Sequence, residues 1–172
     1  MPLYEVAHAT PLSQPQQDAL AEAITELHSK KFTVPRMFIN VIFVDTSNTP
    51  TYVGGKRRHS NRITGRTRKG SRTRDDFNAL CGEIRAAWAR IVHPDVADGK
   101  LPPPELELRA VFITGELIAG MKAIFMTPAA GEELAWAKEN YHAFEERAHA
   151  GDEDFMDLVA ELRTWPGFDV AR

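Results

Sequence analysis

Segments with the apolar pattern of a β-strand alternate along the chain with segments whose apolar residues recur at helical spacing. The first three of these segments predict a β-α-β unit. Residues 2–9, PLYEVAHA, have the β-propensity of a short strand. Proline has no backbone N–H to donate to a neighbouring strand, and here it stands at the first position, where a strand tolerates it. Residues 13–31 carry apolar side chains at helical spacing behind a candidate N-cap, Ser13. The nearly continuous apolar run 37–45, MFINVIFVD, favours a central parallel strand covered by a helix.

The same order of elements returns later in the chain, as expected for a repeated unit. Residues 61–66 are a candidate strand, 73–92 a candidate helix with a threonine N-cap, and 105–115 a second candidate strand. The predicted fold class is therefore α/β. We expect two fused β-α-β units, residues 2–55 and 56–130, that form a mostly parallel four-stranded sheet with two helices on one face.

Two further segments complete the predicted organisation. TYVGG, residues 51–55, is typical of a short hairpin. Beyond the second unit the chain is acidic, and residues 132–150 and 152–163 have helical periodicity. We expect residues 131–172 to form a helical C-terminal extension that packs on the body or on a neighbouring subunit, so that 1–172 make up a single domain.

Composition restricts the class of protein. The 172 residues are 43% hydrophobic, enough for a core, and no apolar run is long enough to span a bilayer. The amino-terminal segment lacks the basic and apolar regions of a secretory signal, so we expect a cytoplasmic protein without membrane contacts. The single cysteine, Cys81, has no disulfide partner and lies at helical spacing among apolar residues, which predicts core packing.

A metal site has only weak support. His142, Glu145 and His149 lie near one another at helical spacing, but the HExxH motif is absent and no third ligand is identified. We therefore expect a solvent-facing helix surface there, and neither a metal nor another cofactor.

Positive charge is concentrated in one stretch. Of the 21 Lys and Arg residues, nine lie between Lys56 and Arg74, where no Asp or Glu occurs. The other 12, against 24 acidic residues, leave the rest of the chain at −12, although the whole carries only −3. We expect the stretch to meet an anion. Nucleic acid is disfavoured because no aromatic side chain is present for base stacking, whereas pairing with the acidic C-terminal helices, including across a subunit interface, stays open.

Pro2 is a candidate for chemistry. A small residue at position two usually permits removal of Met1, which leaves a secondary amine in the α-amino pKa range of about 7.7–8.0. Neighbouring positive charge disfavours the ammonium form, so the amine is suited to act as a base, or as an acid when it is charged. Arginines between Arg62 and Arg74 are suited to clamp a carboxylate by paired hydrogen bonds.

The position of His28 leaves two interpretations open. It lies at the end of the first predicted helix, where a structural histidine would be favoured as the imidazolium, and a functional role is equally compatible with the pattern. In a sheet whose strand starts share an edge, Pro2 and the loop after the fourth strand are expected to meet at one pocket.

Four short motifs carry a family resemblance. They are PLYEV at the start, AITELH ending in His28, YVGG at 52–55, and RKG beginning at Arg68. Their order and spacing over the first two thirds of the chain resemble the tautomerase superfamily, and within it the cis-3-chloroacrylic acid dehalogenase subgroup. The resemblance implies fused β-α-β halves that assemble as a homotrimer.

The resemblance also implies roles for individual residues. Pro2 would be the catalytic acid or base, and His28 would help bind the substrate carboxylate or position water. Arg68 matches the first of two carboxylate-binding arginines. For the second, Arg72 is the first choice and Arg74 the next.

Two departures from the subgroup narrow the expected activity. Ile113 stands where the dehalogenase carries a tyrosine, which makes it a candidate substrate contact. The water-activating glutamate is missing, and Glu116 is the nearest acid without being aligned. We therefore expect keto–enol tautomerisation of a small unsaturated or 2-oxo carboxylic acid. The alternatives are a hydratase, dehalogenase or decarboxylase of a three-carbon acid, and a non-catalytic protein that binds anions or nucleic acid on the same scaffold.

Overall fold

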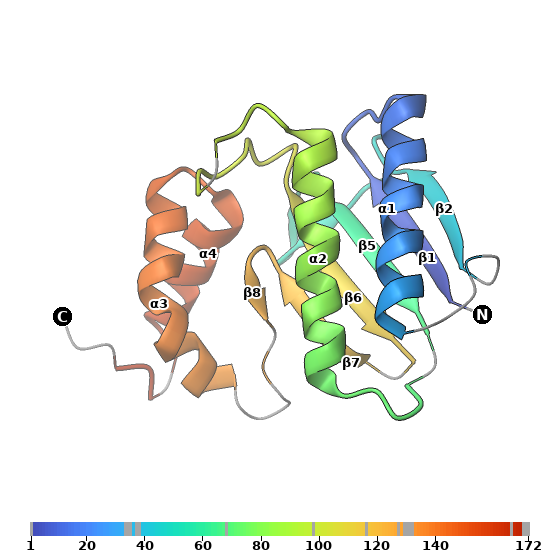
Figure 1. Cartoon of the computed structure of the whole chain (residues 1–172). Helices are drawn as coiled ribbons and strands as arrows, with labels where there is room; N and C mark the ends of the chain where they lie inside the picture. Colours follow the sequence, from blue (N-terminus) through green and yellow to red (C-terminus); the bar gives the residue numbers. More distant parts are fainter. Residues whose placement is uncertain are drawn as a thin grey trace. The chain divides into compact units, whose positions relative to one another are not determined.

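Strands and helices alternate along the computed structural model in the order that two β-α-β units require (Figure 1). The structure describes residues 2–32, 36, 39–67, 69–97, 99–115, 117–126, 128, 133–165 and 167–169. These fall into two compact units, Met1–Thr51 with His59–Met126 and Tyr52–Arg58 with Thr127–Arg172. The first unit contains β1 (Leu3–His8), α1 (Gln14–Phe32), β2 (Asn40–Asp45), β5 (Asn61–Arg66), α2 (Arg74–Val92), β6 (Leu108–Thr114), β7 (Leu117–Lys122) and β8 (Phe125–Met126). The second contains β3 (Tyr52–Val53), β4 (Lys56–Arg57), α3 (Glu133–His149) and α4 (Glu153–Leu162).

The sheet of the first unit is mixed, so the expectation of a mostly parallel four-stranded sheet is wrong. Its six strands have the order β2-β1-β5-β6-β7-β8. Each helical crossover returns its strand parallel, as the β1–β2 and β5–β6 pairs show. The two β-α-β units, however, join through β1 and β5, which run antiparallel, and β7 and β8 add further antiparallel pairs. The α/β class and the C-terminal helices are confirmed.

β2 is an edge strand, contrary to the expected central position. α1 and α2 lie side by side over one face of the sheet (Figure 1). Val41 and Phe43 therefore pack against the core, whereas Ile42 and Val44 are exposed on the face that no helix of this unit covers. The apolar run alternates between a covered and an open face, which explains why it resembles a buried strand in the sequence.

The core lies between the two helices and the sheet. α2 begins with a capping box in which Thr73 and Asp76 exchange side-chain-to-backbone hydrogen bonds. The fully buried side chains of α2 include Phe77 and Cys81, so the predicted core position of the cysteine is confirmed. Burial raises the pKa of the Cys81 thiol to about 12, which keeps it protonated and unreactive.

The second unit joins the short β3–β4 hairpin to α3 and α4. Arg58, just after the hairpin, lies within 3.3 Å of carboxylate oxygens of Glu153 and Asp154, and Lys56 pairs with Asp157 at 2.5 Å. The start of the basic stretch therefore does pair with an acidic C-terminal helix, and it does so within one chain. The single-domain organisation stays a prediction. No helix in the described part of the chain is long and apolar enough to cross a bilayer.

Candidate active site

The antiparallel pairing of β1 and β5 gathers the candidate residues at one edge of the sheet. Leu3, the first residue of β1, stands opposite Arg66, the last residue of β5, and Arg66 in turn stands beside Thr114 at the end of β6. Pro2 precedes this row and is buried, and its carbonyl oxygen accepts a hydrogen bond from the backbone N–H of Asn40 at 3.0 Å. Pro2 is thus held at the edge of the sheet where β2 begins and where β5 and β6 end.

His28 continues the buried stripe of α1 and is not exposed at all. Its Nδ1 lies 2.7 Å from the hydroxyl oxygen of Tyr4, which is equally buried on β1. Its Nε2 is also buried and has no hydrogen-bond partner in the part of the chain that the structure describes. An unsatisfied buried polar group costs about 1–3 kcal/mol, so this nitrogen marks a place where a ligand atom would be stabilising.

Of the two interpretations of His28 left open by the sequence, the charged histidine that caps the helix end does not fit the structure. α1 continues to Phe32, so His28 lies a full turn before its end, and the ring bonds Tyr4 rather than capping the helix. Burial, and secondly the positive charge of Arg72, lower the pKa of His28 to about 4. The imidazole is therefore neutral at physiological pH.

Contacts with Phe32 and Thr67 help to hold Arg72 at the same edge. Its guanidinium lies over the ring of Phe32, with 4.1 Å from Cζ to the ring centroid, and its Nη1 donates to Thr67 Oγ1 at 3.2 Å. A turn precedes it, in which the N–H of Arg72 donates to the carbonyl of Lys69 and Gly70 adopts a φ of +56°. The turn that begins at Lys69 and contains Gly70 thus brings the half-buried Arg72 onto Phe32 of α1.

Ile113 lies in the core beside Tyr4. Both side chains cross Gly65, which pairs with Tyr4 on one side and with Ile113 on the other. A β-carbon on Gly65 would stand 2.6 Å from Tyr4 Cε1 and 2.9 Å from Ile113 Cδ1, so only glycine leaves room for both. Ile113 is fully buried and forms part of the wall behind the Tyr4–His28 pair.

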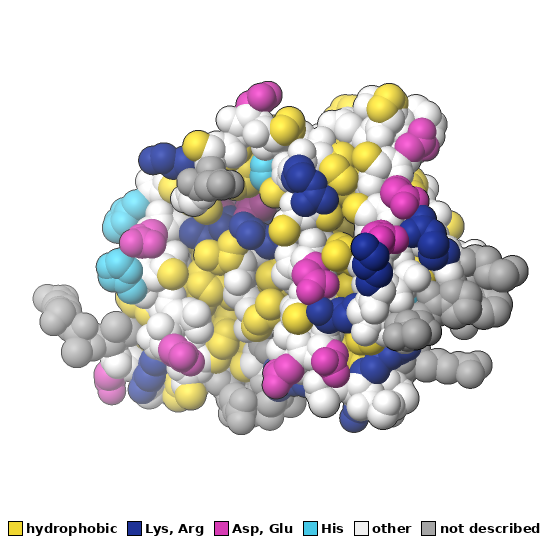
Figure 2. Space-filling model, viewed as in Figure 1, with side chains coloured by type: hydrophobic (Ala, Val, Ile, Leu, Met, Phe, Trp, Pro, Cys, Tyr) yellow, Lys and Arg dark blue, Asp and Glu magenta, His cyan; other side chains and the backbone are white. Residues whose placement is uncertain are grey.

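Among the other described candidates, Arg74 is exposed on the first turn of α2 and is not brought to the cluster of Tyr4, His28 and Arg72. Arg68 and Glu116 lie outside the described residues. Arg62 and Arg66 flank Glu5 on the open sheet face, at 4.0 and 3.9 Å. The basic stretch is thus divided among several places, and over α1 and α2 the Lys and Arg side chains alternate with Asp and Glu (Figure 2).

Sequence reasoning missed three residues of the cluster: Tyr4, Phe32 and Thr67. Two periodicities could have found Tyr4 and Phe32, whereas neither indicates Thr67. Tyr4 stands two residues after Pro2, so the alternation of an extended strand puts both on the same face. Phe32 stands four residues after His28, and their rings lie 4.9 Å apart.

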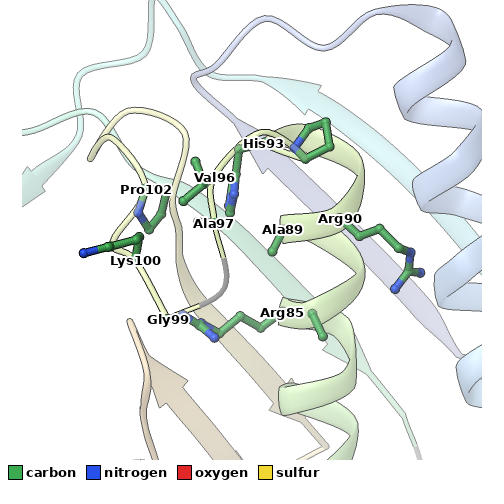
Figure 3. A pocket seen from close by; sticks show the side chains of 11 residues that line it. Arg85, Ala89, Arg90, His93, Val96, Ala97, Gly99, Lys100 and Pro102 are labelled. Carbon is green, nitrogen blue, oxygen red and sulfur yellow. The ribbon is translucent and has the colours of Figure 1, made fainter.

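A hollow of about 490 Å³ lies elsewhere, beside the C-terminal half of α2 and the loop that follows (Figure 3). Arg85, His93 and Lys100 are among its lining residues. Figure 3 shows Arg85 reaching toward Gly99, whereas Arg90 points away. None of the candidate residues lines this hollow, because they lie at the opposite end of α2.

The described residues contain no group of three side chains suited to hold a metal ion. In α3, Nδ1 of His142 lies 3.6 Å from a carboxylate oxygen of Glu146, and Glu145 accepts a hydrogen bond from Arg163 at 3.2 Å. The predicted helix surface therefore carries a His142–Glu146 contact along α3 and a hydrogen bond from Arg163, which follows α4, to Glu145.

Two solved structures with TM-scores above 0.5 support the fold. The structure of native Ps01740 is 21% identical with a TM-score of 0.52, covering 65% of this chain and 91% of the other. A fused 4-OT symmetric trimer is 14% identical with a TM-score of 0.51, covering 65% and 83%. N1, a member of the cis-3-chloroacrylic acid dehalogenase family, is 20% identical with a TM-score of 0.47, covering 90% and 99%. No curated protein sequence matches the chain.

The sequence itself identifies the family. Residues 1–141 match the Tautomerase_3 family, described as "Putative oxalocrotonate tautomerase enzyme", which covers both β-α-β units and the start of α3. The match confirms the resemblance drawn from the four short motifs. The chain belongs to this family, within the tautomerase superfamily.

Proposed function

We propose that the protein catalyses keto–enol tautomerisation of a small unsaturated or 2-oxo carboxylic acid, with the amine of Pro2 as the acid and base. The observation that carries the proposal is the buried imidazole of His28, whose Nε2 lacks a partner in the described part of the chain, within electrostatic reach of Arg72. A neutral donor beside a fixed cation suits an oxygen-rich anion.

The proton transfer uses one group twice. Removal of Met1 exposes the amine of Pro2, and burial of this residue favours the neutral form of the amine. The neutral amine takes the proton from the enol oxygen and becomes an ammonium, and it then delivers that proton to the substrate carbon as the carbonyl forms. The amine is neutral again at the end, so the cycle needs no external proton.

The other side chains hold the substrate. Arg72 donates a pair of hydrogen bonds to the carboxylate, and its stacking on Phe32 fixes the plane of the guanidinium. Arg68 is proposed as the other carboxylate clamp, and Arg74 is the alternative to Arg72. His28 Nε2 donates to the oxygen that gains negative charge, while Ile113 and Tyr4 form the apolar wall behind it.

We also propose that the protein is a homotrimer. One structural neighbour is described as a symmetric trimer, and in this chain the open sheet face exposes Ile42 and Val44 beside the charged trio Glu5, Arg62 and Arg66. Burial of such a face against other copies would cover apolar surface and complete the edge strand β2. Sedimentation should show one trimeric species that Val44→Lys dissociates, and a monomeric wild type would exclude the assembly.

Intact-mass spectrometry of untagged protein, before and after treatment with a halogenated alkynoate, tests the mechanism. We expect a mass without Met1 and a single adduct that maps to Pro2. Arg72→Ala should slow labelling, whereas Arg57→Ala, an exposed arginine of the β3–β4 hairpin, should not. Retained Met1, or a free Pro2 that stays unlabelled, would exclude the mechanism and favour a binding protein on this scaffold.

A further inference from the structure

The Tyr4–His28 pair is enclosed on all sides that the structure describes. Neither residue is exposed, and the two rings meet edge to face at 5.7 Å between centroids. On the other side the imidazole meets the ring of Phe32, at 4.9 Å and 69°. The hydroxyl of Tyr4 is the one hydrogen-bond partner of the imidazole among the described residues, so it controls where the ring proton resides.

The hydrogen bond has one consistent direction. Burial raises the pKa of the Tyr4 hydroxyl well above its ordinary value, so the group is a neutral phenol with an O–H to donate. Nδ1 of His28 is its only acceptor in the described part of the chain. If Nδ1 carried the proton, the phenol hydrogen would be left without an acceptor in the interior, which is the costlier arrangement.

We propose that Tyr4 is a positioning residue that donates its hydroxyl hydrogen to Nδ1 of His28 and thereby holds the imidazole as the neutral tautomer with its proton on Nε2. The second ring nitrogen then points a fixed N–H donor out of the pair. That this donor meets the substrate's developing oxyanion rests on the proposed tautomerase function; the tautomer itself does not.

The charged surroundings agree with a neutral ring. Arg72 is the cation that faces His28, from the loop before α2, and it disfavours a second positive charge. Cys81 of α2 faces Tyr4, and its buried thiol stays protonated, so it offers no anion to stabilise an imidazolium. His28 therefore acts by donating a hydrogen bond and not by transferring a proton.

Nitrogen-15 NMR of the imidazole in the substrate-free protein tests the tautomer directly. We expect the wild type to show a single neutral form, with an unprotonated Nδ1 and a protonated Nε2, from pH 8 down to about pH 5, because the pKa of His28 is lowered to about 4. Tyr4→Phe keeps the ring but removes the donor, and it should shift the Nδ1 resonance and give a mixture of both tautomers. A protonated Nδ1 in the wild type, or unchanged resonances in Tyr4→Phe, would overturn the proposal.

Tyr141→Phe is the matched control, because it removes a buried phenol hydroxyl of the second unit that accepts from Arg163 at 3.1 Å. It should leave the His28 resonances and turnover unchanged. Tyr4→Phe should lower kcat by about tenfold or more, with a smaller change in KM, as is typical when the partner that orients a functional histidine is removed. If the wild type shows the expected tautomer but no turnover, the proposed function is refuted and the proposal for Tyr4 stands. If Tyr4→Phe does not fold, the wild-type tautomer still decides the proposal.

Discussion

Gly65 is the position where a single methyl group should be most informative. In Gly65→Ala the new β-carbon would stand 2.6 Å from Tyr4 Cε1 and 2.9 Å from Ile113 Cδ1, well inside the ordinary carbon contact of about 3.5–4.0 Å. Neither neighbour has room to retreat, because both side chains are fully buried and Tyr4 is bonded to His28. The substitution should therefore displace the Tyr4 ring and, with it, the imidazole.

The expected loss of stability has three contributions. Overpacking of a filled core costs about 1–3 kcal/mol, and disruption of the Tyr4–His28 hydrogen bond adds about 1 kcal/mol. The lower entropy of the unfolded chain with alanine offsets about 0.5–1 kcal/mol. The free energy of unfolding should fall by about 1–3 kcal/mol net, which for a chain of this size lowers Tm by roughly 3–10 °C.

Urea and thermal unfolding with Gly82→Ala as control would measure this effect. Gly82 lies inside α2 with nothing within 4 Å of its would-be β-carbon, so the same change there should stabilise the protein by about 0.5–1 kcal/mol. The two substitutions should thus have opposite signs. A Gly65→Ala protein as stable and as active as the wild type would refute the view that the Tyr4 ring is fixed against this strand.

Three further outcomes are expected. Arg72→Lys keeps the charge but loses the planar fork and the stacking on Phe32, so kcat/KM for a 2-oxo acid should fall about 10–100-fold; an unchanged value would remove Arg72 from the site. Arg58→Ala leaves the carboxylates of α4 without their largely buried counter-charge and should speed proteolysis of the C-terminal unit, whereas exposed Arg57→Ala should not. His28 has a folded pKa of about 4 against about 6.5 when unfolded, so the unfolded chain binds more protons between these values and stability must fall as pH falls. In urea titrations the free energy of unfolding of the wild type should fall by about 2 kcal/mol more than that of His28→Gln between pH 7 and pH 5. An equal fall in both proteins would contradict a buried neutral imidazole.

Local signals in the sequence predict the elements well. The threonine N-cap at Thr73, the helical stripe of α1 and the glycine pair of the β3–β4 hairpin each depend on neighbouring residues, and each is present. The sheet order depends instead on which strands meet across long separations, and the alternation within a strand does not encode that choice. The edge position of β2 was missed for this reason, since Ile42 and Val44 are exposed despite an apolar sequence.

The candidate site likewise contains residues that the sequence predicts and residues that it does not. Pro2 and His28 were predictable as candidates because short motifs of the family resemblance contain them, and Arg72, two residues after the RKG motif, was the first choice for a second arginine. The structure places these three residues at one end of the first unit. Tyr4 and the Phe32 ring were missed because both match the pattern of ordinary core residues. Their roles follow from what they contact, namely one imidazole nitrogen and one guanidinium plane, which no spacing rule specifies.

Because β1 and β5 run antiparallel, equivalent ends of the two β-α-β units lie at opposite edges of the sheet. The two edges differ in how their buried polar groups are hydrogen-bonded. Trp88 stands 14 residues after the first residue of α2, as His28 does in α1, but its indole N–H is satisfied by the carbonyl of Leu106 at 2.8 Å. Asn61, at the start of β5, accepts from two backbone N–H groups that follow β1 and donates to two carbonyls before β6. At the edge of Asn61 these polar groups are thus satisfied by hydrogen bonds within the chain. At the edge of Pro2, Nε2 of His28 has no hydrogen-bond partner among the described residues. The second β-α-β unit thus presents an edge closed by its own hydrogen bonds, and the first β-α-β unit presents the edge that we propose as the reactive one.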